Sequence, residues 1–282
     1  MLSDIFKSEK ISAYGALPLS ACTVLRERYL RDFSERDPFC VMLIAPYPAQ
    51  RREGARFASF AVIPNYHIFF KRLEERILPY FSRKYPDRRF RIFSDVSPID
   101  ERDAACRAGL GVMGDNGLFI AKGQGSFVFI GEMVTDLSSA ELEAEGIGCG
   151  IFEPSGCLHC GKCAEACPAG CIGGDKSFCV SALTQKKGVL TDTECDIIKK
   201  SGYAWGCDVC ALVCPLFEDG ERDINGYFTE SVLRVEGFET MDEMDGETYS
   251  RYAFSWRKKE VIKRNFDILG ENGDDNGISE EK

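Results

Sequence analysis

Long apolar runs are missing from this 282-residue sequence. No window approaches 18 consecutive apolar residues, so we expect neither a membrane span nor a membrane partner. The first residues, Met1 to Lys7, contain no apolar stretch of the kind that a secretory signal peptide needs. With 14 cysteines and no such signal, the sequence predicts a cytoplasmic protein whose thiols bind metal rather than form disulfides.

Two familiar phosphate-binding motifs are also absent. Glycines are dense between Gly109 and Gly125, but they form neither a G-x-G-x-x-G segment that opens a helix nor a P-loop. The sequence therefore gives no support to simple dinucleotide binding. The glycine density instead indicates tight turns or a close approach of the backbone to a ligand.

Positive charge is in the minority. The chain has 35 Lys and Arg against 45 Asp and Glu; residues 1–140 hold 20 and 17 of them (net +3), and residues 141–282 hold 15 and 28 (net -13). This balance argues against broad affinity for nucleic acid, although a local basic face remains an alternative. One basic run lies between Arg83 and Arg91, and we favour its interpretation as a solvated helix end and loop.

Two cysteine runs carry the strongest signal. The first is Cys157-Leu-His-Cys160-Gly-Lys-Cys163-Ala-Glu-Ala-Cys167-Pro168, the C-x2-C-x2-C-x3-C-P spacing of bacterial ferredoxins. The second, Cys207-Asp-Val-Cys210-Ala-Leu-Val-Cys214-Pro215, is one cysteine short, and Cys179 can supply it. In two-cluster ferredoxins the last cysteine of each run binds the other cluster. The predicted ligands are Cys157, Cys160, Cys163 and Cys214 for cluster 1, and Cys167, Cys179, Cys207 and Cys210 for cluster 2.

Structural zinc is the alternative for paired C-x2-C runs. It is disfavoured because a zinc site needs four ligands and no crossing C-x3-C-P segment. His159 lies inside the first run and is predicted to tune a cluster rather than bind iron. Four other cysteines match no ligand position and are interpreted as buried or incidental thiols: Cys106, Cys149, Cys171 and Cys195.

The first half of the chain alternates between strand and helix patterns. Apolar runs predict strands at 40–45, 90–93, 118–121 and 127–134, the last two paired as a hairpin. Amphipathic patterns predict helices at 23–33, 66–85, 98–108 and 255–269, the last packing through Trp256, Val261 and Phe266. The order predicts a three-layer α/β (or α+β) domain at 1–145, with ligands at the strand ends near Asp95. A ferredoxin-like double [4Fe-4S] domain (146–220), a C-terminal extension (221–269) and a disordered tail (270–282) follow.

Several segments together resemble a known family, the epoxyqueuosine reductases, which use cobalamin and two [4Fe-4S] clusters. The resemblance covers about Phe60 to Phe217. Besides both cysteine runs, the segments that carry it are Asn65-Tyr66-His67, Phe93-Ser-Asp95-Val-Ser-Pro98-Ile-Asp-Glu101-Arg102, Ala108-Gly-Leu-Gly111, Gly125-Ser-Phe-Val-Phe-Ile-Gly-Glu132 and Tyr203-Ala-Trp-Gly-Cys207-Asp208.

The resemblance implies a corrinoid between the α/β domain and the cluster domain. It also implies an electron donor such as ferredoxin or flavodoxin, and epoxyqueuosine in transfer RNA as the substrate, within queuosine biosynthesis. Asp95 matches the family's proton donor, and the implied cofactor-binding residues are Tyr66, His67, Asp95, Gly109, Gly111, Gly125 and Ser126. Usual members continue into helical HEAT-type repeats, so the sequence is expected to be a shortened member that lacks them.

Other interpretations stay open for the single residues and for the function. Asp95 can cap the helix predicted from Pro98, Tyr66 can be the edge of a core, and His67 can be a hydrogen bonder at a helix N-terminus. For the whole chain, the alternatives to a corrinoid-dependent oxidoreductase are a two-cluster electron carrier and an activator that reduces a corrinoid protein.

Overall fold

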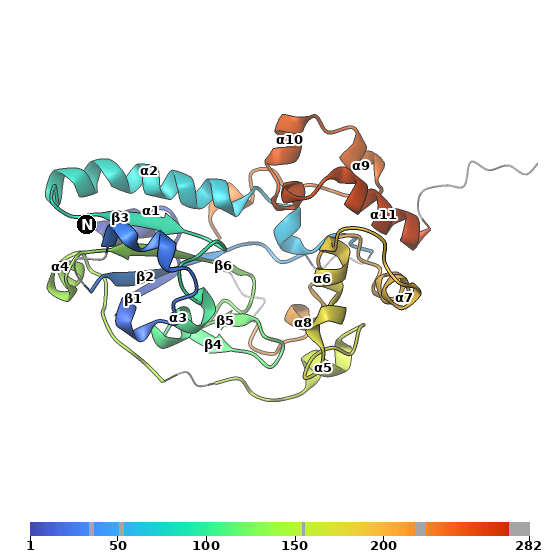
Figure 1. Cartoon of the computed structure of the whole chain (residues 1–282), viewed down its shortest axis with the longest axis horizontal. Coiled ribbons are helices and arrows are strands. Elements are labelled where there is room, and N and C mark those ends of the chain that lie inside the picture. Colours follow the sequence, from blue (N-terminus) through green and yellow to red (C-terminus); the bar gives the residue numbers. More distant parts are fainter. Residues whose placement is uncertain (34–36, 51–53, 154–155, 218–223, 271–282) are drawn as a thin grey trace, which may run out of the picture.

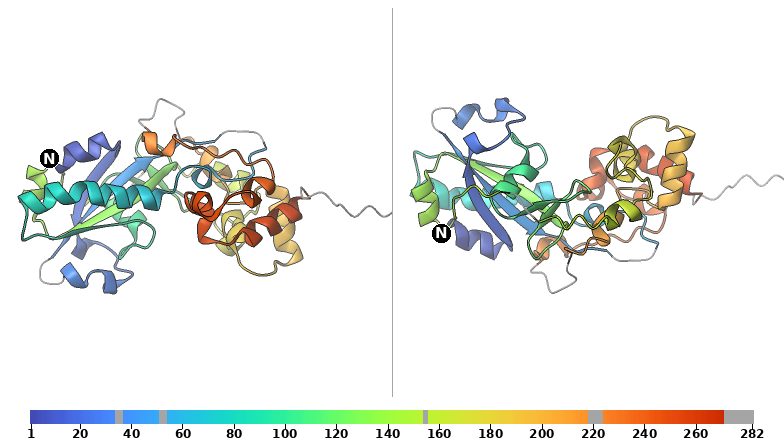
Figure 2. Two further views of the ribbon diagram at one scale, coloured as in Figure 1. Left: turned by 90° about the horizontal axis from the view of Figure 1, so that it is seen from above. Right: turned by 90° about the horizontal axis from the view of Figure 1, so that it is seen from below.

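The computed structural model describes residues 1–33, 37–50, 54–153, 156–217 and 224–270. Two lobes lie side by side: a sheet lobe (residues 1–50 and 66–153) and a helical lobe (residues 156–217 and 236–270) (Figures 1 and 2). A charged loop is expected from the sequence at 218–222, and it lies outside the described residues, as does the expected disordered tail (270–282) apart from Gly270. Within those residues, no helix has the length and apolar character to cross a membrane.

The sheet lobe is built on four antiparallel strands in the order β1-β2-β6-β3. Strands β2 and β6 form its centre, where Val41 faces Met133 and Met42 faces Glu132. The bounds are β1 (Ala13–Pro18), β2 (Phe39–Pro46), β3 (Phe90–Phe93) and β6 (Val128–Thr135). Three of these are predicted as strands, at 40–45, 90–93 and 127–134, and the structure confirms all three.

Helices cover both faces of this sheet (Figure 1). The side chains of Val41 and Leu43 enter a core with Phe69 and Ile77 of α2 (Tyr66–Lys84). The alternate side chains of β2 enter a second core with α3 (Glu101–Arg107). Strand periodicity sends successive side chains to opposite faces, so an unbroken apolar strand needs cover on both sides.

One expectation about this sheet is wrong. The predicted hairpin between 118–121 and 127–134 does not form, since β5 (Phe119–Ala121) pairs with β4 (Gly111–Met113) in a separate two-stranded sheet. The four strands are antiparallel, so the rule for parallel strands does not support a ligand near Asp95, and that position stays a prediction. The mixed α/β class holds.

The remaining helices are short. They comprise α1 (Leu2–Ser8), α4 (Ser139–Ala144), α5 (Lys162–Ala166), α6 (Val180–Gln185), α7 (Asp192–Ser201), α8 (Val209–Leu212), α9 (Glu239–Asp242), α10 (Gly246–Ser250) and α11 (Lys259–Leu269). Single 3-10 turns lie at Leu19–Ala21, Glu27–Tyr29, Arg31–Phe33, Ser59–Ala61, Lys176–Phe178, Gly226–Phe228 and Ala253–Trp256.

Three predicted helices differ from the structure. The segment 23–33 forms only two 3-10 turns, and the helix expected from Pro98 begins at Glu101. The helix expected at 255–269 begins at Lys259, which leaves Trp256 outside it and 56% exposed, with the Arg257 guanidinium over its ring. Trp256 is therefore not part of the packing side of α11, whereas Phe266 is fully buried.

The segment before α2 joins the two lobes. Phe57 forms a parallel bridge with Trp205, and the buried Asp208 accepts hydrogen bonds from the backbone and the hydroxyl of Ser59 at 2.6 and 2.5 Å. Phe57, Trp205 and Phe266 belong to the same core as the α2 face of the sheet. One apolar core therefore runs from the sheet lobe into the helical lobe and holds the second cysteine run against the first part of the chain.

Candidate iron–sulfur and active-site region

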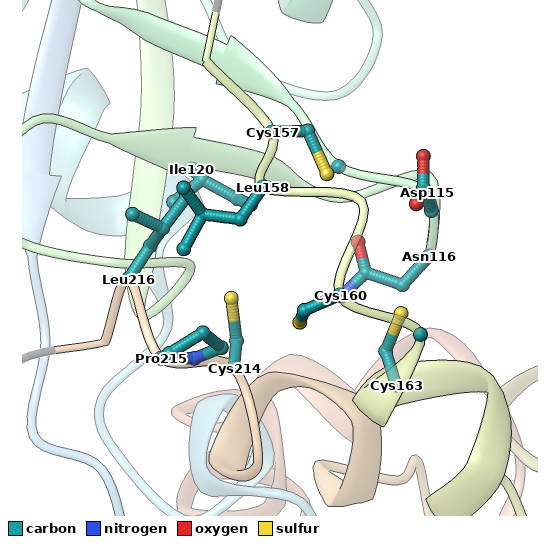
Figure 3. Close-up of a pocket in the computed structure, with 12 residues that line it drawn as sticks. Asp115, Asn116, Ile120, Cys157, Leu158, Cys160, Cys163, Cys214, Pro215 and Leu216 are labelled. Atoms are coloured by element: carbon teal, nitrogen blue, oxygen red, sulfur yellow. The ribbon is translucent and has the colours of Figure 1, made fainter.

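Four cysteines line one pocket at the junction of the lobes. Cys157 and Cys160 come from the first loop, Cys163 from α5, and Cys214 from the segment after α8, and all four surround a common space (Figure 3). The rest of the lining is Gly114, Asp115, Asn116, Ile120, Leu158, Gly161, Pro215 and Leu216. Gly114, Asp115 and Asn116 belong to the turn between β4 and β5, so the sheet lobe also contributes to the wall of this pocket.

A second pocket holds five thiols. Its lining includes Cys167, Cys179, Cys207, Cys210 and also Cys171, which no ligand spacing had singled out. The other lining residues are Asn116, Pro168, Ile172, Lys176, Val180 and Val209. Asn116 lines both pockets, so the two sites are neighbours. Each pocket combines thiols from both runs.

Local backbone geometry explains how the thiols converge. Gly161 has φ +74°, which an L side chain rarely adopts, and it turns the chain from Cys160 into α5. Helices α5 and α8 pack on each other, and each ends one or two residues before a Cys-Pro pair. Proline cannot continue a helix, so the chain leaves at Pro168 and Pro215.

The donor set fits an iron–sulfur cluster in both pockets. Thiolates are the usual cluster ligands, and each pocket supplies at least four sulfur atoms. Burial, above all, raises the pKa of Cys207 and of Cys210 to about 12. These thiols therefore keep their protons unless a bound metal replaces them.

The other cysteines lie apart from both pockets. Cys106 is buried in the second core, while Cys149 and Cys195 are partly buried elsewhere. His159 has φ +48°, and its Nδ1 lies 2.9 Å from a carboxylate oxygen of Asp115. Single ligand atoms of Asp115, Cys157 and His159 lie within 4.8 Å of one another, so His159 adjoins the first pocket through this contact.

Tyr66, His67 and Asp95 come together at the start of α2. The Tyr66 hydroxyl donates a hydrogen bond to Asp95 Oδ2, His67 Nε2 lies 3.6 Å from the same oxygen, and His67 Nδ1 lies 3.1 Å from Ser94 Oγ. Asp95 has φ +60°, an uncommon conformation that aspartate tolerates better than most residues. The loop after β3 thus presents the carboxyl group to the Tyr66–His67 pair.

The structure distinguishes between the roles suggested for Asp95, His67 and Tyr66. The N-cap of α3 is Asp100, which accepts from the backbone N–H groups of Arg102 and Asp103, so Asp95 is not the helix cap. The His67 side chain contacts Ser94 and Asp95 rather than the end of its helix. Tyr66 does pack on the edge of the first core, with its ring stacked on Phe129 at 4.2 Å between centroids.

Burial affects the protonation of the groups near Asp95. It raises the pKa of Asp95, although half of that side chain (53%) is exposed and we expect the rise to be modest. Burial first, and then the Asp95 charge, raises the pKa of Glu101 to about 7. Burial lowers the pKa of His67, which favours the neutral imidazole.

Glu132 is a buried acid that contacts this loop through Ser97, and sequence analysis assigned it no role. It is fully buried, and its Oε1 has no hydrogen-bond partner among the residues that the structure describes. Ser97 Oγ lies 2.8 Å from the Ile99 carbonyl and 2.5 Å from Glu132 Oε2. The single hydroxyl proton of Ser97 can serve one of these, and the carbonyl can only accept. Both contacts can be hydrogen bonds if Glu132 is protonated and donates to Ser97 Oγ, while Ser97 donates to the Ile99 carbonyl. This is consistent with burial, which raises the pKa of Glu132 to about 8.

One signal in the sequence could have found Glu132. It is the single acid inside the apolar run from Phe127 to Val134. A carboxyl group in the middle of a buried strand costs free energy unless it is paired or neutral, so its position alone points to a special environment.

The implied cofactor-binding glycines face protein atoms. A Cβ built on Gly109 would lie 2.8 Å from Phe152, one on Gly111 would lie 2.2 Å from the Ile120 carbonyl, and one on Gly125 would lie 2.9 Å from Phe217. Close packing within the chain therefore explains these three glycines. Ser126 differs, because its Oγ is buried and, within the described part of the chain, has no hydrogen-bond partner. An orphaned hydroxyl of this kind fits a polar group of a bound ligand.

Comparison with known proteins defines the class first. Residues 156–216 match the 4Fe-4S double cluster binding domain family. This match and the two thiol pockets make the chain an iron–sulfur protein with a double cluster domain.

Longer similarities reach the rest of the chain. It is 30% identical over 233 residues to an epoxyqueuosine reductase of Lactococcus garvieae (78% of this chain, 62% of that protein), and 28% identical over 274 residues to one of Listeria monocytogenes (87% and 67%). The chain thus spans less than two thirds of the Lactococcus protein. These likenesses make it a relative of the epoxyqueuosine reductases.

Solved structures show the same fold. The epoxyqueuosine reductase of Streptococcus thermophilus superposes with a TM-score of 0.69 at 21% identity, covering 95% of this chain and 79% of that one. An epoxyqueuosine reductase in complex with an epoxyqueuosine-modified stem loop of tyrosine transfer RNA superposes with a TM-score of 0.67, at 21% identity and the same coverage.

Proposed function

We propose that this chain is an iron–sulfur oxidoreductase of the epoxyqueuosine reductase type, which removes the epoxide oxygen of epoxyqueuosine in transfer RNA. The observation that supports the proposal is that the Asp95 loop and the first thiol pocket are linked through the sheet lobe of one molecule. The loop with Asp95 and the turn between β4 and β5 belong to the same lobe, and that turn lines the first thiol pocket. Arg102, which follows the Asp95 loop, donates a hydrogen bond to the Gly117 carbonyl of that turn at 3.1 Å.

Two [4Fe-4S] clusters and a corrinoid, when bound, would supply the electrons, received from a donor such as ferredoxin or flavodoxin. The ligands proposed for cluster 1 are Cys157, Cys160, Cys163 and Cys214. Those proposed for cluster 2 are Cys167, Cys179, Cys207 and Cys210. The residues proposed to hold the corrinoid are Tyr66, His67, Asp95 and Ser126, since Gly109, Gly111 and Gly125 are already packed against protein.

Asp95 is the proposed proton donor. Removing an epoxide oxygen by reduction takes two electrons and two protons and releases water, so the departing oxygen must be protonated. Burial raises the pKa of Asp95, and the Tyr66 hydroxyl fixes the orientation of its carboxyl group. A structure of the Bacillus subtilis relative has a catalytic loop, named for its aspartate, swung out of the active site. An aspartate on a loop suits the same role here.

The test is anaerobic reconstitution with iron, sulfide and cobalamin, followed by an assay on transfer RNA that contains epoxyqueuosine. We expect the wild-type protein to form queuosine. Asp95→Asn should lower the rate by roughly 10²-fold or more, because the amide cannot donate the same proton, while the iron content stays unchanged. Asp103→Asn is the matched control, since Asp103 pairs with Arg107 on the surface of α3. Full activity of Asp95→Asn would remove Asp95 from the mechanism.

A second candidate is a two-cluster electron carrier, or an activator that reduces a separate corrinoid protein. The packing of Gly109, Gly111 and Gly125 against protein favours it, because these glycines then need no ligand. The same reconstitution separates the candidates. A carrier or activator would show only cluster absorption and take up no cobalamin, whereas the reductase would retain cobalamin through gel filtration.

A further inference from the structure

The two pockets differ by one thiol. The first is lined by four cysteines, which is the number that a [4Fe-4S] cube takes from a protein. The second is lined by five, because Cys171 joins the four predicted ligands. One thiol in the second pocket is therefore surplus to a single cube.

Cys171 is placed beside the ligand that crosses from the first run. Its Sγ lies 3.7 Å from the Sγ of Cys167. The backbone N–H of Gly170 donates to the Cys167 carbonyl at 3.0 Å, and Gly170 has φ +59°. This tight turn brings the two sulfur atoms to the same side of the loop, so either one faces the pocket.

Simpler explanations of Cys171 fit less well. Both thiols are free, and 3.7 Å is far longer than a disulfide bond of about 2.05 Å. A buried cysteine often acts as a small apolar side chain in a core. Yet Cys171 is 6% exposed without belonging to any of the apolar cores of the described residues, and it is the one buried residue between Gly156 and Cys179. Its burial comes from the thiol pocket.

We propose that Cys171 is a spare ligand of the second cluster site and can replace Cys167. In the exchange, the Cys171 thiol loses its proton as its sulfur binds iron, and the released Cys167 thiolate takes up a proton. No electron changes hands, and the cube keeps four thiolates. The inference rests on the proposed function only in requiring iron–sulfur clusters, and it is independent of substrate and corrinoid.

The test counts iron and sulfide in anaerobically prepared variants and records the electron paramagnetic resonance spectrum after reduction. The wild-type protein should hold about eight irons per chain, as two cubes require. Cys167→Ala and Cys171→Ala should each keep about eight. The double variant should fall to about four. The matched control is Cys160→Ala, which should fall to about four by itself, because the first pocket has four thiols.

A fall to about four irons in Cys167→Ala alone would overturn the inference. If that variant fails to fold, Cys167→Ser provides the second test, since serine is close to cysteine in size. Resonance Raman bands of a cube with four thiolates are expected for Cys167→Ser, and bands of an iron–oxygen ligand would contradict the proposal. A wild-type protein without iron would instead overturn the proposed function, so the two failures are distinguishable.

Discussion

Strand β2 and the loops of the first cysteine run show two ways of ordering a chain. Every residue from Cys40 to Ala45 is fully buried between two helical layers. Between Gly156 and Cys179 only Cys171 is buried. A buried aliphatic side chain stabilises a fold by about 1.5–3 kcal/mol, and these loops gain almost none of that. The strand is held by burial, so the loops must be held by what their thiols bind.

The comparison extends to polar groups. In the sheet lobe the fully buried Glu145 accepts hydrogen bonds from the Leu2 backbone, Tyr80, Tyr85 and Lys84. In the cluster loops the corresponding groups are thiols, four lining the first pocket and five lining the second. The hydrogen bonds of Glu145 therefore stabilise the sheet lobe without a ligand, whereas the thiol-bearing loops need a bound metal to become ordered.

The largest expected effect is therefore loss of a ligand in the loops. Cys163→Ala should lower the iron content from about eight to about four per chain and leave residues 156–167 open to proteolysis, because cluster binding and loop order are coupled. The sheet lobe should keep its protection in hydrogen exchange. The measurement is an iron assay with limited proteolysis under anaerobic conditions.

Cys149→Ala is the matched control for that change. The Cys149 thiol lies outside both pockets, near the backbone carbonyls of Ser139 and Ile147, so iron content should not move. An unchanged iron count in Cys163→Ala would contradict the ligand assignment, and protease sensitivity spread over the sheet lobe would contradict the division into two regions.

The same contrast explains what the sequence could predict. Regular apolar patterns and cysteine spacing are local signals, so strands β2, β3, β5 and β6, helix α2 and the two cysteine runs could be predicted from the sequence. The pairing of β5 with β4 is local, but the apolar pattern of a strand does not by itself determine which strand it pairs with. A Cβ on Gly111 would lie 2.2 Å from the Ile120 carbonyl, so this pairing needs glycine there. The turn from Cys167 to Cys171 is local, but the spacing does not show that both sulfur atoms line one pocket with Cys179. The contact between Glu132 and Ser97 joins residues far apart in the sequence and depends on tertiary structure.

The resemblance predicted more of the site than the spacing did. It singled out Tyr66, His67 and Asp95, which the structure brings together through two contacts to Asp95 Oδ2. It also singled out three glycines whose packing needs no ligand. A motif identifies residues that belong together in a fold, and it does not separate those that touch a ligand from those that let the backbone pack.

A smaller effect is expected at the satisfied acid of the sheet lobe. Glu145→Gln should lower the free energy of unfolding by about 1–3 kcal/mol at pH 7, since charged hydrogen bonds are lost. Burial alone would raise the pKa of Glu145, but Lys84, the Leu2 N–H and the two tyrosines outweigh it and lower the pKa. The wild-type advantage is thus complete above the unfolded pKa near 4.5 and fades as the pH falls through the lower folded value.

The measurement for Glu145 is urea unfolding followed by circular dichroism at several pH values. Lys84→Met is the companion variant, because it removes the half-exposed cation (43% exposed) and should cost less than Glu145→Gln. Equal stability of Glu145→Gln and the wild type at pH 7 would show that this network does not hold the lobe together.

At the unsatisfied acid the expected effect is the smallest of the series near pH 5, and it grows as the pH rises. Burial raises the folded pKa of Glu132 to about 8, above an unfolded value near 4.5. The contribution of Glu132 to stability is therefore complete below pH 4.5 and is lost as the pH rises toward 8, because the unfolded chain ionises first. Glu132→Gln cannot ionise, and its neutral amide can still donate to Ser97. In urea unfolding it should match the wild type near pH 5 and become the more stable of the two toward pH 8. A variant that loses stability at every pH, as Glu145→Gln does at pH 7, would mean that Glu132 is charged in the folded protein.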